Sequence, residues 1–291
     1  GNYTIGEKNY YFDTYTGAMY KGLQTNKDGE TIYYGEDGVQ LFGEQKAEGK
    51  WRYFDKDNGG VMAKNTFIDL KGKKVYYGED GSMTYGEKKI DGHWMYFDTY
   101  TGAMQTGIVN LPGKTVCYDE EHGWMIYGNY TIGEKNYYFD TYTGAMQIGW
   151  MTREDGGDLY YGADGVQLFG EQKVEGKWRY FDRDNGGVMA KNTFIDLKGK
   201  RVYYGEDGGI TYGEKKIDGH WMYFDTYTGA MRTGFVSLPG KTVYYNDGGL
   251  MLYGEQKIGG KWYAFNEITG AMICNGYYQG HYYGADGVRI S

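Results

Sequence analysis

Apolar and aromatic residues recur along this chain at a short, regular interval. A pair of aromatic residues, or one aromatic with a small apolar partner, returns about every 21 residues and is usually followed by an acidic residue and a glycine. The pairs are Tyr11-Phe12, Tyr33-Tyr34, Tyr53-Phe54, Tyr76-Tyr77, Tyr96-Phe97, Cys117-Tyr118, Tyr138-Phe139, Tyr160-Tyr161, Tyr180-Phe181, Tyr203-Tyr204, Tyr223-Phe224, Tyr244-Tyr245, Ala264-Phe265 and Tyr282-Tyr283. This period predicts fourteen short structural units.

Each unit has the composition of a two-stranded hairpin. In residues 137–146 an aromatic run meets an Asp/Thr/Gly turn and then a second apolar run that ends at Met146, which predicts strand, turn and strand. Gly144 would supply the positive φ that such a turn requires. The chain holds 51 glycines and 2 prolines, and no apolar pattern of helical period lasts without a glycine, so we expect no helix.

The chain also copies itself over a longer period. Residues 1–43 recur almost letter for letter at 128–170, a shift of 127 residues (130 − 3), and a third copy begins at Gly254. Such self-similarity predicts an array in which each unit buries its apolar face against its neighbours. We therefore predict a single repeat array over residues 1–291, with long repeats at 1–127 and 128–253 and a partial repeat at 254–291. Because the chain begins within a repeat, we expect it to be a piece of a longer protein.

A lone hairpin is marginally stable in water, so the predicted hairpins must stack. The expected fold is an all-β, elongated hairpin solenoid. A methionine follows most of the turns at one register, and an unbranched apolar residue suits the axis of a stack. We predict that most of these methionines lie in the core: Met19, Met62, Met104, Met146, Met189, Met231 and Met272.

Charge and composition narrow the choice of partners. The formal net charge of -8 argues against nucleic acid or an anionic membrane as a partner. No apolar run approaches the length of a membrane span, and no signal-peptide pattern is present. Cys117 and Cys274 lie about eight units apart in a linear stack, so we expect free, half-buried thiols. Few cysteines are compatible with an exported bacterial protein.

The repetition itself argues against catalysis, because a general base needs a unique constellation of residues. The sequence contains no zinc-protease, nucleophile-elbow or phosphate-loop motif. Asp55, Asp57 and Gly59 resemble the start of a calcium loop, but Thr66 stands where such a loop has Glu, and we interpret the segment as a polar turn. We predict no enzyme activity, no metal and no cofactor, although a catalytic domain could lie outside this segment.

One pattern resembles a known superfamily. Residues 92–107 read G-x-W-x-Y-F-D-x-x-T-G-A-M-x-x-G, which is similar to the cell-wall-binding repeats of Gram-positive bacteria and their phages. That superfamily includes choline-binding modules, glucan-binding repeats and the C-terminal repeats of clostridial toxins. The resemblance covers essentially the whole chain. It implies a hairpin solenoid with about three hairpins per turn, ligands in aromatic clefts between consecutive hairpins, and a location outside the cell at the wall.

The resemblance also implies where choline would bind. In choline-binding members, a Trp directly after the glycine that closes each hairpin forms one wall of the site. Here only Trp150 matches, with Phe235 and Tyr277 as aromatic substitutes, while most other units have Glu, Thr or Leu. A quaternary ammonium needs several aromatic walls. We expect a full set only near Trp150, between the hairpins of Tyr138 and Tyr160, which makes choline the alternative ligand.

Carbohydrate fits the remaining pattern. Sugars stack their apolar faces on Trp or Tyr rings while polar groups take the hydroxyls, and tryptophans here follow a polar residue at a recurrent register. We predict a non-catalytic module that anchors or targets a surface protein or lysin to wall polysaccharide through several weak clefts. The alternatives are a choline-binding module and a toxin-like receptor for host glycans. The predicted ligand residues are Trp51, Trp94, Tyr138, Trp150, Tyr160, Trp178, Trp221, Phe235, Trp262 and Tyr277.

Overall fold

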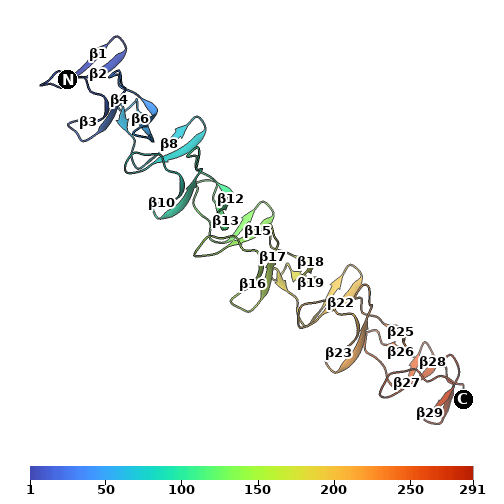
Figure 1. Ribbon diagram of the computed structural model, residues 1–291. Helices are drawn as coiled ribbons and strands as arrows, with labels where there is room; N and C mark the ends of the chain where they lie inside the picture. Colours follow the sequence, from blue (N-terminus) through green and yellow to red (C-terminus); the bar gives the residue numbers. More distant parts are fainter. Residues whose placement is uncertain (291) are drawn as a thin grey trace. The chain divides into compact units, whose positions relative to one another are not determined.

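The computed structural model describes residues 1–290 and consists of antiparallel β-hairpins (Figure 1). Fourteen small sheets occur in the described residues, and each is built around one hairpin. The chain divides into two compact units, Gly1–Gln147 and Ile148–Ser291. The predicted all-β hairpin repeat is confirmed.

The first unit contains seven hairpins, formed by strands that are consecutive in the sequence. β7 adds a third strand to the sheet of β5 and β6. The strands are β1 (Asn2–Ile5), β2 (Lys8–Tyr11), β3 (Gly22–Thr25), β4 (Thr31–Tyr34), β5 (Gly43–Ala47), β6 (Lys50–Asp55), β7 (Val61–Met62), β8 (Thr66–Leu70), β9 (Lys73–Tyr77), β10 (Gly86–Ile90), β11 (His93–Phe97), β12 (Gly107–Leu111), β13 (Lys114–Tyr118), β14 (Gly128–Ile132) and β15 (Lys135–Phe139).

The second unit repeats this plan with seven more hairpins. β20 is the third strand beside β18 and β19. The strands are β16 (Gly149–Thr152), β17 (Asp158–Tyr161), β18 (Gly170–Val174), β19 (Lys177–Asp182), β20 (Val188–Met189), β21 (Thr193–Leu197), β22 (Lys200–Tyr204), β23 (Gly213–Ile217), β24 (His220–Phe224), β25 (Gly234–Leu238), β26 (Lys241–Tyr245), β27 (Gly254–Ile258), β28 (Lys261–Phe265), β29 (Gly276–Tyr278) and β30 (His281–Tyr283).

The turn that closes each hairpin lies before the aromatic pair, and the predicted position after the pair is wrong. In the hairpin of β10 and β11, Ile90 pairs with His93, so the loop consists of two residues. These are Asp91 and Gly92, with φ of 49° and 88°. Positive φ at both residues is the type I′ geometry that matches the twist of the flanking strands.

The Asp-Thr-Tyr-Thr-Gly segment, which occurs four times, forms a second, separate turn after the hairpin that precedes it. Asp140 accepts hydrogen bonds from the N–H of Tyr142 and of Thr143 and from the Thr143 hydroxyl. Gly144 has the predicted positive φ, 68°. The following methionine forms only an isolated bridge to Phe139, so the expected second strand is a single contact here. The Asp140 side chain thus satisfies the backbone N–H groups at the tip of the turn.

The second residue of each aromatic pair fills the core. In the described chain the large side chains with essentially no exposure alternate between Phe and Tyr, one in each hairpin from β5 onward: Phe54, Tyr77, Phe97, Tyr118, Phe139, Tyr161, Phe181, Tyr204, Phe224, Tyr245, Phe265 and Tyr283. The first residue of the pair is half-buried in many hairpins, including Tyr53, Tyr96 and Tyr138. Full burial of one such ring stabilises the fold by about 1.5–3 kcal/mol.

The segment after each hairpin returns to the hairpin before it. Met83 follows β9, and its N–H donates to the carbonyl of Trp51 in β6 at 2.9 Å. Met125 follows β13 and donates in the same way to Trp94 at 2.8 Å. These bonds join neighbouring hairpins into a stack within each unit. They also tie the backbone of each of these tryptophans to the next hairpin.

The predicted core methionines divide into two groups. Met62 and Met189 are buried, whereas the other five are half-buried. Methionines in this register lie beneath a glycine of the following unit. A Cβ on Gly102, for example, would overlap the sulfur of Met83. The stack therefore needs both the methionine and the glycine.

The two cysteines are free, as predicted. Cys117 is buried at a position that Tyr holds in most hairpins, and burial raises the pKa of its thiol to about 11. Cys274 is exposed. The described residues include no helix that could span a membrane.

Candidate functional site

Five hairpins carry an exposed tryptophan as the second residue of their second strand. Their side chains are exposed by 40–42%. They are Trp51, Trp94, Trp178, Trp221 and Trp262. Because Phe and Tyr already fill the core, a repeated exposed indole indicates a binding surface.

Trp94 forms one side of a cleft of about 330 Å³. Three consecutive hairpins of the first unit and the segments that follow them build it. The lining residues are Glu87, Trp94, Lys114, Met125, Tyr127, Tyr142 and Thr143. The cleft therefore combines three aromatic rings, one thioether and one pair of opposite charges.

The second unit contains an equivalent cleft of about 180 Å³ beside Trp221. Its lining residues are Glu214, Trp221, Lys241, Met251, Ile268 and Thr269. The only change in kind at a shared position is Ile268, which stands where the first cleft has Tyr142. The repeat thus copies the indole, the methionine and the Glu-Lys pair, but the lining of the second cleft contains no tyrosine.

Ion pairs hold the polar end of both clefts. Lys114 lies 3.0 Å from Glu87 and donates to the carbonyl of Thr143 at 3.4 Å. The hydroxyl of the buried Tyr118 donates to Glu87 at 3.4 Å. Tyr127 lines the same cleft as Glu87, and burial, followed by the charge of this carboxylate, raises the pKa of the tyrosine. The carboxylate is neutralised by Lys114, so the cleft carries little net charge.

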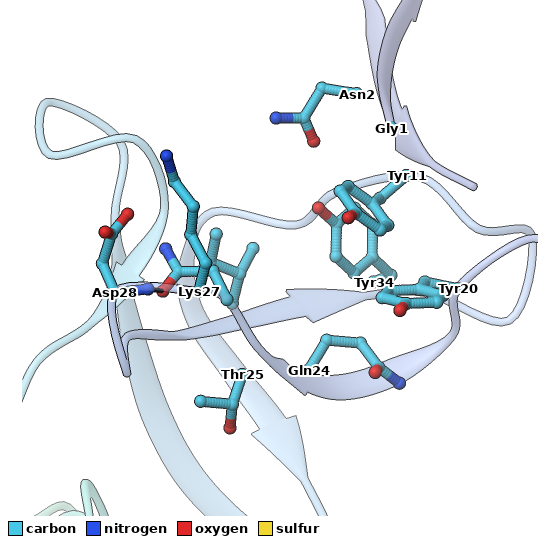
Figure 2. A pocket seen from close by; sticks show the side chains of 11 residues that line it. Gly1, Asn2, Tyr11, Tyr20, Gln24, Thr25, Lys27, Asp28 and Tyr34 are labelled. Carbon is cyan, nitrogen blue, oxygen red and sulfur yellow. Dashed lines mark hydrogen bonds between the residues drawn. The ribbon is translucent and has the colours of Figure 1, made fainter. Parts of the chain in front are cut away.

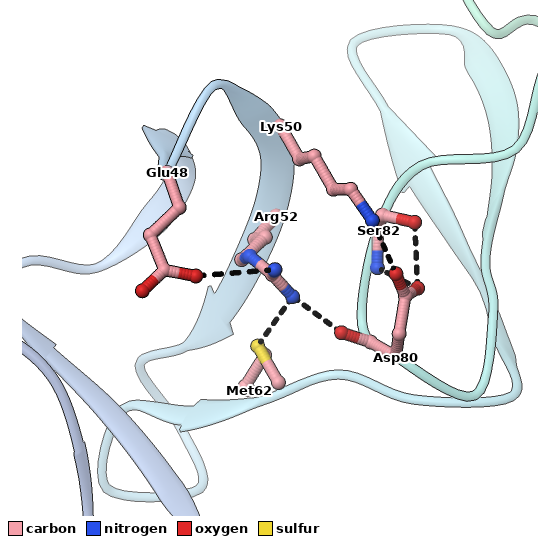
Figure 3. A network of polar contacts seen from close by, with 6 residues as sticks. All are labelled: Glu48, Lys50, Arg52, Met62, Asp80 and Ser82. Carbon is pink, nitrogen blue, oxygen red and sulfur yellow. Dashed lines mark hydrogen bonds and ion pairs between the residues drawn. The ribbon is translucent and has the colours of Figure 1, made fainter.

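A related cleft of about 550 Å³ lies beside Trp178. Lys177 and Asp207 form an ion pair of 2.6 Å there, and Tyr212, exposed by 42%, is the second aromatic residue. In the first unit Lys50 lies 2.8 Å from Asp80, which also accepts hydrogen bonds from Ser82 (Figure 3). The cleft of Trp178 carries more charge around the indole than the cleft of Trp94.

Comparison with known proteins identifies this architecture. The choline-binding repeat family matches residues 20–67, 68–107, 147–194 and 232–277. The chain belongs to this family. Among curated protein sequences, none is significantly similar to it.

Solved structures share the fold of these choline-binding repeats. Choline binding protein F from Streptococcus pneumoniae has 23% identity over 100% of this chain and 98% of that chain, with a TM-score of 0.56. The same protein in the presence of a peptidoglycan analogue has 23% identity over 93% and 98%, with a TM-score of 0.50. At this identity the likeness establishes the fold.

The choline-binding repeats place the predicted ligand residues in different settings. Trp94 and Trp221 line the paired clefts, and Trp178 lines the more polar one. Phe235 is exposed by 44% and packs edge-on against Tyr244, whereas Tyr277 is exposed by 76%. Half-buried Tyr138 belongs to the first unit, and half-buried Trp150 and Tyr160 belong to the second. A choline site between these hairpins stays a prediction.

Sequence reasoning missed the tyrosines of the clefts. Tyr85, Tyr127 and Tyr212 are exposed by 39–42% and stand two residues after the bridging Met or Ile. Tyr142 is 92% exposed at the tip of its rigid Asp turn. The recurring sequence Met/Ile-x-Tyr-Gly was the available signal, and its tyrosine lines the cleft of Trp94 and that of Trp178.

A further groove of about 390 Å³ lies at the first two hairpins (Figure 2). Tyr11 and Tyr20 line it with ring centroids 4.5 Å apart, and Tyr34 stands beside them. Its lining residues include no tryptophan. The groove therefore lacks the indole that defines the other clefts.

Proposed function

We propose that this chain is a wall-binding module that holds choline-bearing polymers of the bacterial cell wall in its tryptophan clefts. The observation that carries this proposal is the cleft of Trp94, where Tyr127 and Tyr142 add two aromatic walls and Met125 adds an apolar one. The place of action would be the outside of the cell, at the wall. Any catalytic activity of the whole protein would belong to other segments.

Cation–π attraction explains the choice of ligand. A quaternary ammonium has no N–H group to donate, so aromatic faces and soft apolar groups suit it better than hydrogen-bond acceptors. The sequence pattern alone favoured carbohydrate, because Glu87 stands where choline-binding members have Trp. Tyr127 and Tyr142 supply the missing aromatic surface from the following hairpins. Choline therefore becomes the first candidate.

Affinity would come from several clefts acting together. One exposed cation–π contact contributes about 0.5–1 kcal/mol, rising to about 2 kcal/mol when desolvated. A single cleft would thus bind weakly. Clefts that engage successive choline groups on one polymer would raise the overall affinity through effective concentration.

The test is the removal of Trp94 and of Trp221, singly and together. We expect each single Ala variant to lower the number of choline molecules bound in calorimetry. The double variant should lose retention on a choline-substituted matrix disproportionately. The matched control is Trp124→Ala, since Trp124 is exposed by 38% but stacks against His93 at 3.8 Å and does not line the cleft. Unchanged choline binding by a folded double variant would refute the proposal.

A second candidate ligand is wall glycan without choline. The charged surroundings of Trp178 favour it, because Lys177, Asp207 and Thr211 could take sugar hydroxyls while the indole stacks on a sugar face. Retention on choline-free wall polysaccharide, lost in Trp178→Ala and kept in Trp124→Ala, would support this ligand. Retention on mammalian glycans instead would favour a host-glycan receptor.

A further inference from the structure

Trp150 faces a cation that belongs to the chain itself. The guanidinium of Arg179 lies 5.1 Å from the centroid of the Trp150 ring. Tyr160 meets the same indole edge-on, with centroids 4.9 Å apart and an interplanar angle of 79°. A cation at this distance from an indole face is in the range of cation–π attraction. The ring that the sequence pattern marks as a choline wall thus already has a cation against it.

Arg179 is fixed in place by its surroundings. Its side chain is buried, and Nη1 donates to the backbone carbonyl of Asp207 and lies 3.5 Å from the sulfur of Met189. Asp207 is held in turn by Lys177. On the far side, the indole N–H of Trp150 donates to Glu175 at 3.0 Å. A mobile ligand would have to displace a buried, hydrogen-bonded guanidinium to reach this face.

The first unit contains the same arginine without the indole. Arg52 is buried, donates to the carbonyl of Asp80 and lies 3.5 Å from the sulfur of Met62 (Figure 3). Leu23 stands at the position equivalent to Trp150. A carboxylate oxygen of Glu48 lies 3.9 Å from the guanidinium of Arg52. The counterpart of Glu48 is Glu175, which accepts the hydrogen bond from the Trp150 indole. The anchoring of the arginine therefore does not depend on a tryptophan.

We propose that Arg179 is a specificity-determining residue, an internal cation that occupies the aromatic surface of Trp150 and Tyr160 and excludes external quaternary ammonium ions. This inference rests on the proposed function, in which choline binds at Trp94 and Trp221. It assigns choline to the clefts with a Glu-Lys pair. It excludes choline from the aromatic surface of Trp150, although the sequence there most resembles a choline site.

The experiment removes each arginine in turn and counts bound choline by calorimetry. We expect Arg179→Ala to gain one choline site per chain relative to the unmodified protein, with a change in tryptophan fluorescence on binding. Arg52→Ala is the matched control, because it deletes an equally buried arginine beside Leu23 and should gain none. The melting temperature should fall by a similar amount in both variants. A folded Arg179→Ala without an added site, or an equal gain in Arg52→Ala, would overturn the proposal.

A second variant keeps the proposal testable if the arginine variants fail to fold. Trp150→Leu introduces the residue that the first unit carries at Leu23, beside an intact arginine. We expect its choline stoichiometry and affinity to equal those of the unmodified protein. Loss of a site in this variant would mean that Trp150 already binds choline, which contradicts the proposal. Failure of the proposed function has a different signature, namely unchanged choline binding in Trp94→Ala and Trp221→Ala.

Discussion

Replacement of Tyr204 by Phe should destabilise the protein at neutral pH and stabilise it in alkali. The Tyr204 ring is fully buried, and its hydroxyl donates to Glu171 at 3.0 Å. Burial first, and then the charge of Glu171, raises the pKa of Tyr204 far above its ordinary value. Phe181 and Phe224 fill the same position in the two adjacent hairpins, so phenylalanine fits the space.

Two effects of opposite sign set the magnitude. At neutral pH the variant loses one hydrogen bond to a partly exposed carboxylate, which costs about 1 kcal/mol. In the unfolded chain tyrosine ionises near pH 10, while folded Tyr204 keeps its proton. The unmodified protein therefore loses about 1.4 kcal/mol of stability per pH unit above about pH 10, until the folded-state pKa is reached. Phenylalanine does not titrate, so the two proteins should be equally stable near about pH 10.7.

Urea unfolding followed by tryptophan fluorescence measures this crossover. Both proteins would be titrated at about pH 7, 10.7 and 11.5, and the free energies of unfolding compared. The control is Tyr100→Phe, because Tyr100 is 93% exposed and its replacement should change stability at none of these values. A stability difference of the same sign and size at neutral and alkaline pH would refute the reasoning.

Three further predictions concern the stack and its turns. Gly102→Ala should lower the melting temperature more than Gly107→Ala; both have positive φ, but only the first would press a Cβ onto Met83, adding about 1–3 kcal/mol of overpacking. Phe97→Ala should cost about 3–5 kcal/mol in urea unfolding, clearly more than loss of the exposed Trp94 ring in the same strand. Hydrogen bonds from Lys191 and Thr152 lower the pKa of Asp158, so its carboxylate stabilises the fold above about pH 4 and less as pH falls through the folded-state pKa. Asp158→Asn should accordingly lower the melting temperature at neutral pH and have little effect at about pH 2, and equal losses at both would contradict this.

The repeat and its hairpins could be predicted because their signals are local. An aromatic pair at a fixed period and glycine at turns determine strand and turn within about 21 residues. The exposure of Trp94 also followed, since the aromatic pair after it already filled the core. The position of the turn that closes each hairpin could not be predicted from the sequence. Asp91-Gly92 and the Asp-Thr-Tyr-Thr-Gly segment are both strong turn signals, and only the strand register of β10 and β11 decides which one closes the ladder.

The clefts could not be assembled from the sequence because their walls come from different hairpins. Tyr127 and Tyr142 reach Trp94 from the next two hairpins, and local patterns do not encode how hairpins rotate against each other. The contact of Arg179 with Trp150 is equally non-local. The local pattern of its strand does not indicate that Arg179 is buried.

The alternation of Phe and Tyr in the core limits which deletions and duplications of hairpins the fold can accept. The core tyrosine donates its hydroxyl hydrogen bond to a glutamate of the preceding hairpin. Tyr118 donates in this way to Glu87, and Tyr245 donates to Glu214. A recombination event that deleted one hairpin would bring two hairpins of the same kind together, and it would separate both the hydroxyl and the lysine from their glutamate. Deleting or duplicating two hairpins would preserve the alternation of Phe and Tyr. The internal copy of 127 residues, with its six hairpins, obeys this rule of even numbers.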